Sequence, residues 1–244
     1  MASGRRAWIP NQHGAWAMLV TPVIVGALLS GPNPWHLLLG LAWLSAYCAH
    51  YFAGLAVKSH RFTRYRAQIL TYGVVCAVLA VPLAAHEPRL LLLAPAALLA
   101  FAVNIAFILR RNERAWINDA VGIALAALVG VGAVWLGTTP ALTSRAIAVI
   151  AVIALYFLGT VVYVKTLIRE RGSVAWLRAS WALHAAFVAA AAIAGSWAVA
   201  AVSAGLLARS AIVPGRRWSP KRVGLVEIGW TVLVAVVALA TIGH

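Results

Sequence analysis

Residues 144–168, SRAIAVIAVIALYFLGTVVYVKTLI, decide the fold class of this chain. The stretch has charged residues only near its two ends, at Arg145 and Lys165. A helix that crosses a bilayer needs about 20 mostly apolar residues. A strand of a membrane barrel would need only about 10 residues of alternating polarity. Because the stretch is longer than such a strand and apolar on all sides, we predict a transmembrane helix.

Eight further apolar runs follow the same pattern. They cover roughly residues 15–31, 34–57, 68–85, 89–109, 116–137, 175–194, 197–213 and 223–243. The composition agrees, because 64% of the residues are hydrophobic and only 10% are charged, against about a quarter charged in soluble domains. We therefore expect an all-α, polytopic protein of the cell membrane with nine transmembrane helices, solvated by the lipid bilayer as a single domain over residues 1–244.

The basic residues indicate how these helices are oriented. Of the 20 Lys and Arg residues, 18 lie in the N-terminal segment or at the second, fourth, sixth and eighth connections between runs, and only Arg89 and Arg145 lie at the others. Basic residues are enriched in the cytoplasmic loops of membrane proteins. We therefore predict a cytoplasmic N-terminus and a C-terminus on the outside. Since the basic residues lie between apolar runs, we expect no nucleic-acid partner.

Metal and disulfide chemistry has little support in the sequence. Cys48 and Cys76 both fall inside apolar runs and are interpreted as small core residues. The chain contains no HxxxH, CxxC or ExxH pattern, so we expect no dedicated transition-metal site. No nucleotide-binding or hydrolase motif occurs either, so the cofactor, if any, is left unknown.

Polar side chains gather on the predicted cytoplasmic side, which favours a cavity that faces the cytoplasm between helix ends. The candidate ligand-binding residues are Asn11, Gln12, Lys58, Asn104, Asn118, Tyr163, Lys165, Arg169 and Arg209, and the candidates for proton transfer are His13, Asp119 and Glu227.

Several of these residues have a structural interpretation beside the functional one. For Asp119, capping of the helix that begins near residue 116 is the alternative. A lone carboxylate inside a membrane helix is costly, so we expect Glu227 to form a buried pair with a Lys or Arg of another helix. Lys165 and Arg169 share one helix face and either reach the membrane interface or form an anion site. The same two alternatives stand for Arg209.

The remaining candidates are uncharged or lie in the loops. We expect Asn104 to bond another helix, and Gln12 and His13 to face the helix ends that carry Asp119 and Lys165. His13 is otherwise a hydrogen-bonded residue at a helix entry, the commonest role of a lone histidine. Two acids of the connections, Glu113 and Glu170, are expected to pair with the arginines beside them in the sequence.

Four stretches of the chain carry a family resemblance. WIPNQHGAWAML (8–19), RRNERAWINDAVGI (110–123), LGTVVYVKTLIRERG (158–172) and PGRRWSPKRVGLVEIG (214–229) together resemble the YwiC-like family of bacterial membrane proteins. That family has no established biochemical activity, so the resemblance implies a bacterial inner-membrane protein and no particular chemistry.

A more distant resemblance concerns the whole pattern of helices. Nine helices, an inner N-terminus and polar inner connections after the second and sixth helices are similar to the UbiA superfamily of intramembrane prenyltransferases. Those enzymes bind Mg²⁺-diphosphate with Asp-rich motifs at these two positions. Here residues 50–66 contain no acid and residues 163–171 contain one, so no metal ligand carries over. The resemblance instead implies that Lys58, Lys165 and Arg169 could hold an anionic head group directly.

Three functions fit these observations. We favour a UbiA-like membrane enzyme or lipid-binding protein that holds an anionic lipid or prenyl-type ligand in a cationic cavity. The second is an accessory membrane protein that docks a partner at its inner face. The third is a small-solute transporter. Against it, the third, fifth, seventh and eighth helices have almost no polar residues toward the outside, and a translocation path needs polar groups at mid-depth. The reaction, the ligand and the oligomeric state are left open.

Overall fold

The computed structural model describes residues 8–10, 15–139, 141–216 and 218–242, and the regular structure in these ranges is entirely helical. The α-helices are α1 (Ala15–Ser30), α2 (Pro34–Ser59), α3 (Phe62–His86), α4 (Ala94–Leu109), α5 (Trp116–Trp135), α6 (Ser144–Ile168), α7 (Val174–Ile193), α8 (Trp197–Ile212) and α9 (Pro220–Thr241), and the 3₁₀-helix η1 (Pro88–Leu93) precedes α4. Each predicted apolar run therefore coincides with one α-helix, except that the run 89–109 covers both η1 and α4. The predicted all-α fold class is confirmed.

The largest difference from the predicted boundaries is at the start of α3. This helix begins at Phe62 rather than near residue 68. The turn before it is very short, because His60 takes up a left-handed conformation with φ 53° and ends α2. The first turns of α3 consequently carry Arg64 and Arg66, which a hydropathy profile counts as loop.

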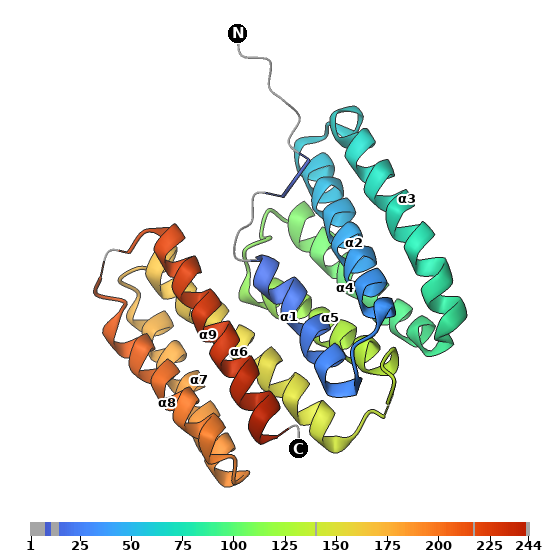
Figure 1. Cartoon of the computed structure of the whole chain (residues 1–244). Helices are drawn as coiled ribbons and strands as arrows, with labels where there is room; N and C mark the ends of the chain where they lie inside the picture. Colours follow the sequence, from blue (N-terminus) through green and yellow to red (C-terminus); the bar gives the residue numbers. More distant parts are fainter. Residues whose placement is uncertain (1–7, 11–14, 140, 217, 243–244) are drawn as a thin grey trace.

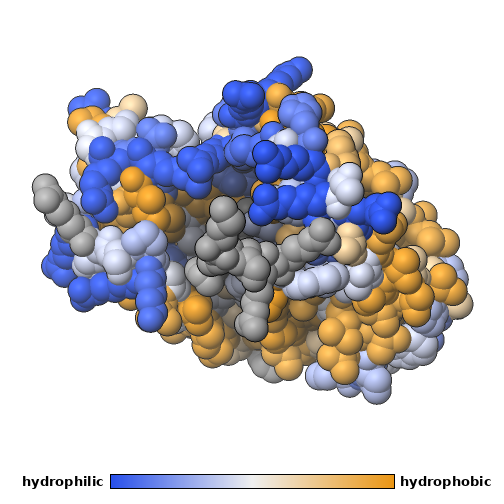
Figure 2. Space-filling view, turned by 90° about the horizontal axis from the view of Figure 1, so that it is seen from above, coloured by the Kyte–Doolittle hydropathy of each residue, from blue (hydrophilic) through white to orange (hydrophobic). Residues whose placement is uncertain are grey.

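Consecutive helices run in opposite directions, so the connections alternate between the two ends of the bundle (Figure 1). Helix α3 lies at one edge and α7 and α8 at the other, with α1, α5, α6 and α9 between them. The α2–α3, α4–α5, α6–α7 and α8–α9 connections share one end, which we call the basic end. Figure 2 views this end and shows hydrophilic side chains over it, with hydrophobic side chains along the flanks.

Seven helical segments in the described part of the chain are long and apolar enough to cross a membrane. Together with their exposed Leu, Ile and Val side chains, they show that the chain is a multi-pass membrane protein. The apolar helices α1 and α8 are shorter, with 16 residues each. The count of nine spans and the orientation in the membrane therefore stay predictions.

Helices α1 and α5 approach each other closely. A Cβ atom added to Gly26 of α1 would lie only 2.5 Å from the carbonyl oxygen of Gly130 in α5. One added to Gly137, just after α5, would lie 2.1 Å from the hydroxyl of Ser30. Small residues at these positions let the two backbones touch, which is a common means of helix association in membranes.

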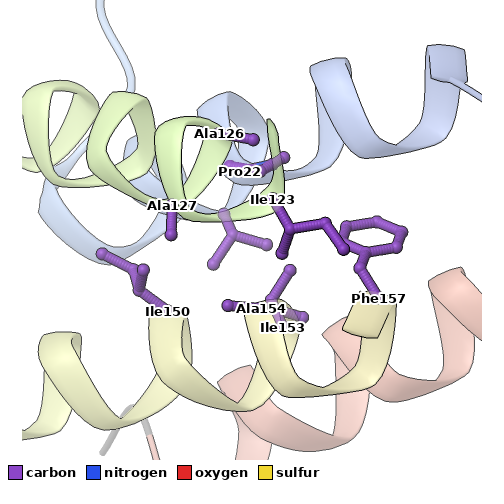
Figure 3. A pocket seen from close by; sticks show the side chains of 9 residues that line it. Pro22, Ile123, Ala126, Ala127, Ile150, Ile153, Ala154 and Phe157 are labelled. Carbon is purple, nitrogen blue, oxygen red and sulfur yellow. The ribbon is translucent and has the colours of Figure 1, made fainter. Parts of the chain in front are cut away.

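A small gap lies between α1, α5 and α6 (Figure 3). It is lined by apolar side chains, among them Pro22, Ile123 and Phe157, and its volume is about 10 Å³. A space of this size holds at most one water molecule, and without polar partners it stays dry. The centre of the bundle is therefore closely packed at this point and offers no room for a solute.

Candidate functional site

The ends of α5 and α6 meet in an ion pair at the basic end. Lys165 Nζ lies 2.9 Å from Asp119 Oδ2, and the Lys165 side chain is only 8% exposed. The same ammonium group donates a hydrogen bond to the backbone carbonyl of Arg114. Lys165 is thus held inside the protein instead of extending to the membrane interface. The N-cap position of α5 is Ala115, which has no capping side chain. Asp119 lies in the first turn of α5, where its negative charge is favourable to the helix, and it also pairs with Lys165.

A second ion pair joins Lys58, at the end of α2, to Glu113 in the α4–α5 connection. We expected Glu113 to pair with the arginines beside it, but its partner comes from another helix, 55 positions away in the sequence. The hydrogen bond from Lys58 holds the pKa of the Glu113 carboxyl below its usual value. Lys58 itself is half-exposed, so the contribution of this pair to stability is small.

The α4–α5 connection, residues 110–115, therefore joins two distant helix ends. Its Glu113 side chain binds Lys58 of α2, and the next carbonyl, from Arg114, accepts the hydrogen bond of Lys165 from α6. The connection is also braced from within, because Asn118 Nδ2 donates to the Glu113 carbonyl at 2.9 Å. One short loop thus positions the ammonium groups of Lys58 from α2 and Lys165 from α6.

Beside this loop lies an open cleft of about 520 Å³. Its lining residues are Asn112, Arg114, Ala115, Trp116, Lys165, Arg169, Glu170 and Trp176. Within the described ranges the guanidinium groups of Arg114 and Arg169 form no ion pair. The cleft therefore offers two arginines outside any salt bridge, beside two indole rings, at the end of the bundle that carries the hydrophilic side chains (Figure 2). Glu113 and Asp119 lie close enough to interact electrostatically with Arg114 and Arg169 respectively.

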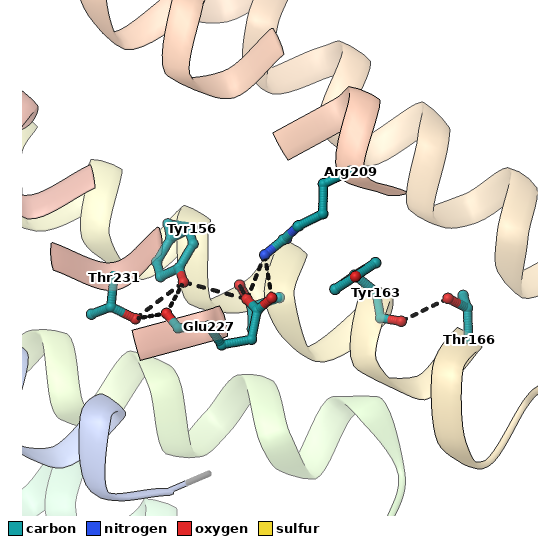
Figure 4. Close-up of polar contacts among 7 residues, drawn as sticks. Tyr156, Tyr163, Thr166, Arg209, Glu227 and Thr231 are labelled. Carbon is teal, nitrogen blue, oxygen red and sulfur yellow. Dashed lines mark hydrogen bonds and ion pairs between the residues drawn. The ribbon is translucent and has the colours of Figure 1, made fainter. Parts of the chain in front are cut away.

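A separate polar cluster lies between α6, α8 and α9 (Figure 4). Arg209 Nη1 of α8 lies 2.5 Å from Glu227 Oε1 of α9 and also contacts Oε2. Glu227 Oε2 accepts hydrogen bonds from the hydroxyls of Thr160 at 3.3 Å and Tyr156 at 3.4 Å. Tyr156 in turn shares a hydrogen bond with Thr231. This arrangement confirms the expected buried pair for Glu227.

Arg209 is enclosed by the protein. The residue is 6% exposed, and its guanidinium carbon lies 4.1 Å from the centre of the Tyr163 ring. Trp230 of α9 flanks it at 5.6 Å. Neither Arg209 nor Lys165 therefore extends its charge to the membrane surface.

The candidate residues divide into two groups on different sides of α6. Tyr163 contacts Arg209 of α8, whereas Lys165, two positions on, contacts Asp119 of α5, as expected for residues two apart on a helix. Lys58, Asn118 and Arg169 belong to the group at the α4–α5 connection. They do not form one cavity with Arg209 and Glu227.

Some candidates do not join either group. The Asn104 amide of α4 makes no hydrogen bond with any residue that the structure describes. Asn11, Gln12 and His13 lie outside the described residues, so their expected position facing Asp119 and Lys165 stays a prediction.

Other residues of the site were not among the candidates. Arg114, Trp116 and Trp176 line the cleft, and Thr160 and Tyr156 bind Glu227. The two tryptophans carried a usable signal, because indole rings beside basic residues at helix ends are typical of a membrane interface. Thr160 and Tyr156 carried none, since hydroxyl groups are common in membrane helices.

The comparisons with known proteins agree with the family resemblance. The family model described as "YwiC-like protein" matches residues 9–134. The chain is 36% identical over 225 residues to "Uncharacterized protein YwiC" of Bacillus subtilis (strain 168). The matched region covers 91% of this chain and 93% of that protein. It is 29% identical over 231 residues to an "Uncharacterized protein" of Haemophilus influenzae, covering 95% and 97% of the two chains. No solved structure matches.

Proposed function

Since the chain belongs to the YwiC-like family, we propose its function from the site itself: it holds the anionic head group of an amphiphilic lipid in the cleft beside the α4–α5 connection. The observation that carries this proposal is the pair of arginines, Arg114 and Arg169, which line the cleft and form no salt bridge with a carboxylate of the described residues. Planar guanidinium groups bind phosphate oxygens through paired hydrogen bonds.

The tryptophans of the cleft suit an amphiphile rather than a free anion. Trp116 is 49% exposed, and Trp176 lies 5.9 Å from Lys165 Nζ. Indole rings favour the zone where polar head groups meet acyl chains, because one edge of the ring is polar and the rest is apolar. A lipid head group in the cleft would therefore place its first carbons against these rings.

The charge of the cleft suits a single phosphate. Three cations line it together with one acid, Glu170, and Lys165 is paired with Asp119. The small remaining positive charge matches a phosphodiester or a singly charged phosphomonoester. A diphosphate carries more negative charge and would need divalent cations, and the described residues include no cluster of acids or histidines that could hold a metal ion.

The proposal includes a UbiA-like arrangement of the helices. Its support lies at the ends of α2 and α6, the positions at which that superfamily carries its ligand motifs. In this chain both ends reach the α4–α5 connection, through Lys58 and Lys165. In this proposal the two lysines shape the loop and the arginines bind the ligand. A transport function has less support, because the gap between α1, α5 and α6 is minute and apolar.

Lipid retention by the purified protein tests the proposal. We expect native mass spectrometry of the wild-type protein to detect a bound phospholipid or prenyl phosphate. In the double variant Arg114→Gln/Arg169→Gln the amount of retained lipid should fall about tenfold or more, because one to two charge-assisted hydrogen bonds are lost. The matched control is Arg89→Gln/Arg145→Gln, which removes two arginines from the opposite end of the bundle. Equal retention by all three proteins would refute the proposal.

A further inference from the structure

Among the described residues that line the cleft, Glu170 is the single acid. We expected it to pair with the arginines beside it in the sequence, but its carboxylate forms no salt bridge and no hydrogen bond with any residue that the structure describes. Arg171 donates instead to the carbonyl of Leu167, and Lys165 is paired with Asp119. An open carboxylate therefore stands in the wall of a cleft that is otherwise cationic.

The backbone of the α6–α7 connection fixes the position of this carboxylate. The N–H of Glu170 donates to the Lys165 carbonyl at 2.8 Å, and the Glu170 carbonyl accepts from the N–H of Ser173 at 3.0 Å. Gly172 has a left-handed φ of 87°, which suits a tight turn. The Ser173 hydroxyl then caps α7 by accepting from the N–H of Trp176. One ordered turn thus holds Glu170 and Trp176 at the same cleft.

The indole rings of the cleft are suited to a cation. The Trp176 ring already has Lys165 Nζ at 5.9 Å from its centre. Trp116 is 49% exposed, and no cation of the described residues lies over its ring. Ammonium groups are attracted to the faces of indole rings. The open carboxylate and the open indole face are therefore groups that can recognise an alkylammonium.

The cation that suits these groups has to be joined to an anion. A free cation entering the cleft would be repelled by its three basic residues, Arg114, Lys165 and Arg169. Arg169 and Glu170 are consecutive and both line the cleft, yet they form no salt bridge, so their opposite charges stay apart. The phosphodiester of an amino alcohol carries a negative and a positive group separated by an ethylene unit, which matches this arrangement.

We infer that the lipid head group in the cleft is a phosphodiester that carries an ammonium group, an inference that rests on the proposed function. The phosphate lies against the guanidinium groups of Arg114 and Arg169. The ammonium group lies between the Glu170 carboxylate and the Trp116 ring. A head group without the ammonium would leave Glu170 unpaired beside a bound phosphate, where like charges repel.

Competition between two lipids with the same phosphodiester tests the inference. The wild-type protein is equilibrated in mixed micelles with equal amounts of phosphatidylethanolamine and phosphatidylglycerol of identical acyl chains, and the retained lipids are quantified by mass spectrometry. Glu170→Gln removes the negative charge and keeps the size of the side chain. Glu87→Gln is the matched control, because Glu87 lies in a pair with Arg89 at the opposite end of the bundle.

We expect the wild-type protein to retain phosphatidylethanolamine over phosphatidylglycerol about fivefold or more, from one partly exposed ion pair and one cation–π contact. The basic end alone would favour phosphatidylglycerol, so this preference reports the ammonium group. The ratio should fall to about one or below in Glu170→Gln and stay unchanged in Glu87→Gln. Displacement of the bound lipid by glycerophosphoethanolamine would identify the free ester as the ligand, whereas displacement only by added phosphatidylethanolamine identifies the lipid.

The two levels of the reasoning fail in different ways. Equal retention of both lipids by the wild-type protein, or an unchanged ratio in Glu170→Gln, would overturn the inference and leave the proposed function standing. Retention of neither lipid above the level of Arg114→Gln/Arg169→Gln would refute the proposed function itself, and the inference with it.

Discussion

Removal of the negative charge of Glu227 tests the pairing that organises α6, α8 and α9. In Glu227→Gln the side chain keeps an oxygen that can accept from Thr160 and Tyr156, so the change isolates the charge. The Arg209 side chain is 4% exposed and would be left as a buried cation without a counter-ion. Breaking a buried pair in this way costs about 3–5 kcal/mol, so we expect a loss of that order in the free energy of unfolding.

The assay is reversible unfolding in mixed micelles, followed by circular dichroism as the fraction of sodium dodecyl sulfate rises. Glu113→Gln is the matched control, since it removes the same charge from a half-exposed pair with Lys58 and should cost less than about 1 kcal/mol. In Arg209→Met/Glu227→Leu both charges are gone, and stability should return to within about 2 kcal/mol of the wild-type value. If Glu227→Gln costs no more than Glu113→Gln, the pair is not the buried interaction described here.

Three further outcomes can be measured. Gly26→Ala should lower the free energy of unfolding by about 1–3 kcal/mol, because its new Cβ atom would lie 2.5 Å from a carbonyl oxygen of α5; an unchanged value in the same micelle assay would contradict the close contact. Lys58 lowers the pKa of Glu113 below its usual value of 4.5. Above pH 4.5 Lys58→Met should therefore be less stable than the wild-type protein by the full contribution of the pair, and this difference should vanish as the pH falls through the lowered pKa. A difference that persists at low pH would refute the pairing. A cysteine at Gly172 should react with an impermeant maleimide only after the cell is opened, whereas one at Thr139 should react in intact cells; the reverse pattern would invert the predicted orientation.

The helices were predictable from the sequence because a membrane span needs a long apolar run and little else. The start of α3 was not, since Arg64 and Arg66 lie within the helix and hydropathy counts them as loop. The length of such a run says where the chain crosses the membrane, but the turn at His60 decides where the helix begins.

The candidate site was predictable in its composition but not in its pairing. A lone carboxylate inside a membrane helix must find a cation, so the pair of Glu227 was foreseeable, although its partner depends on how α8 packs against α9. The partner of Glu113 was not foreseeable, because Lys58 lies far away in the sequence while three arginines lie close by. The separation of Tyr163 from Lys165 follows from helix geometry, but only the neighbours of α6 show which group each residue joins.

The shortness of α8 affects the lipid around the protein. Its 16 residues give an apolar cylinder about 24 Å long, about 6 Å less than the hydrocarbon thickness of a typical bilayer. The helix lies at the edge of the bundle, with Trp197 at its start 73% exposed. Lipids beside α8 must compress to match it, at a cost of a fraction of a kcal/mol per Å. The protein should therefore thin the bilayer on this side and partition into thinner membrane regions.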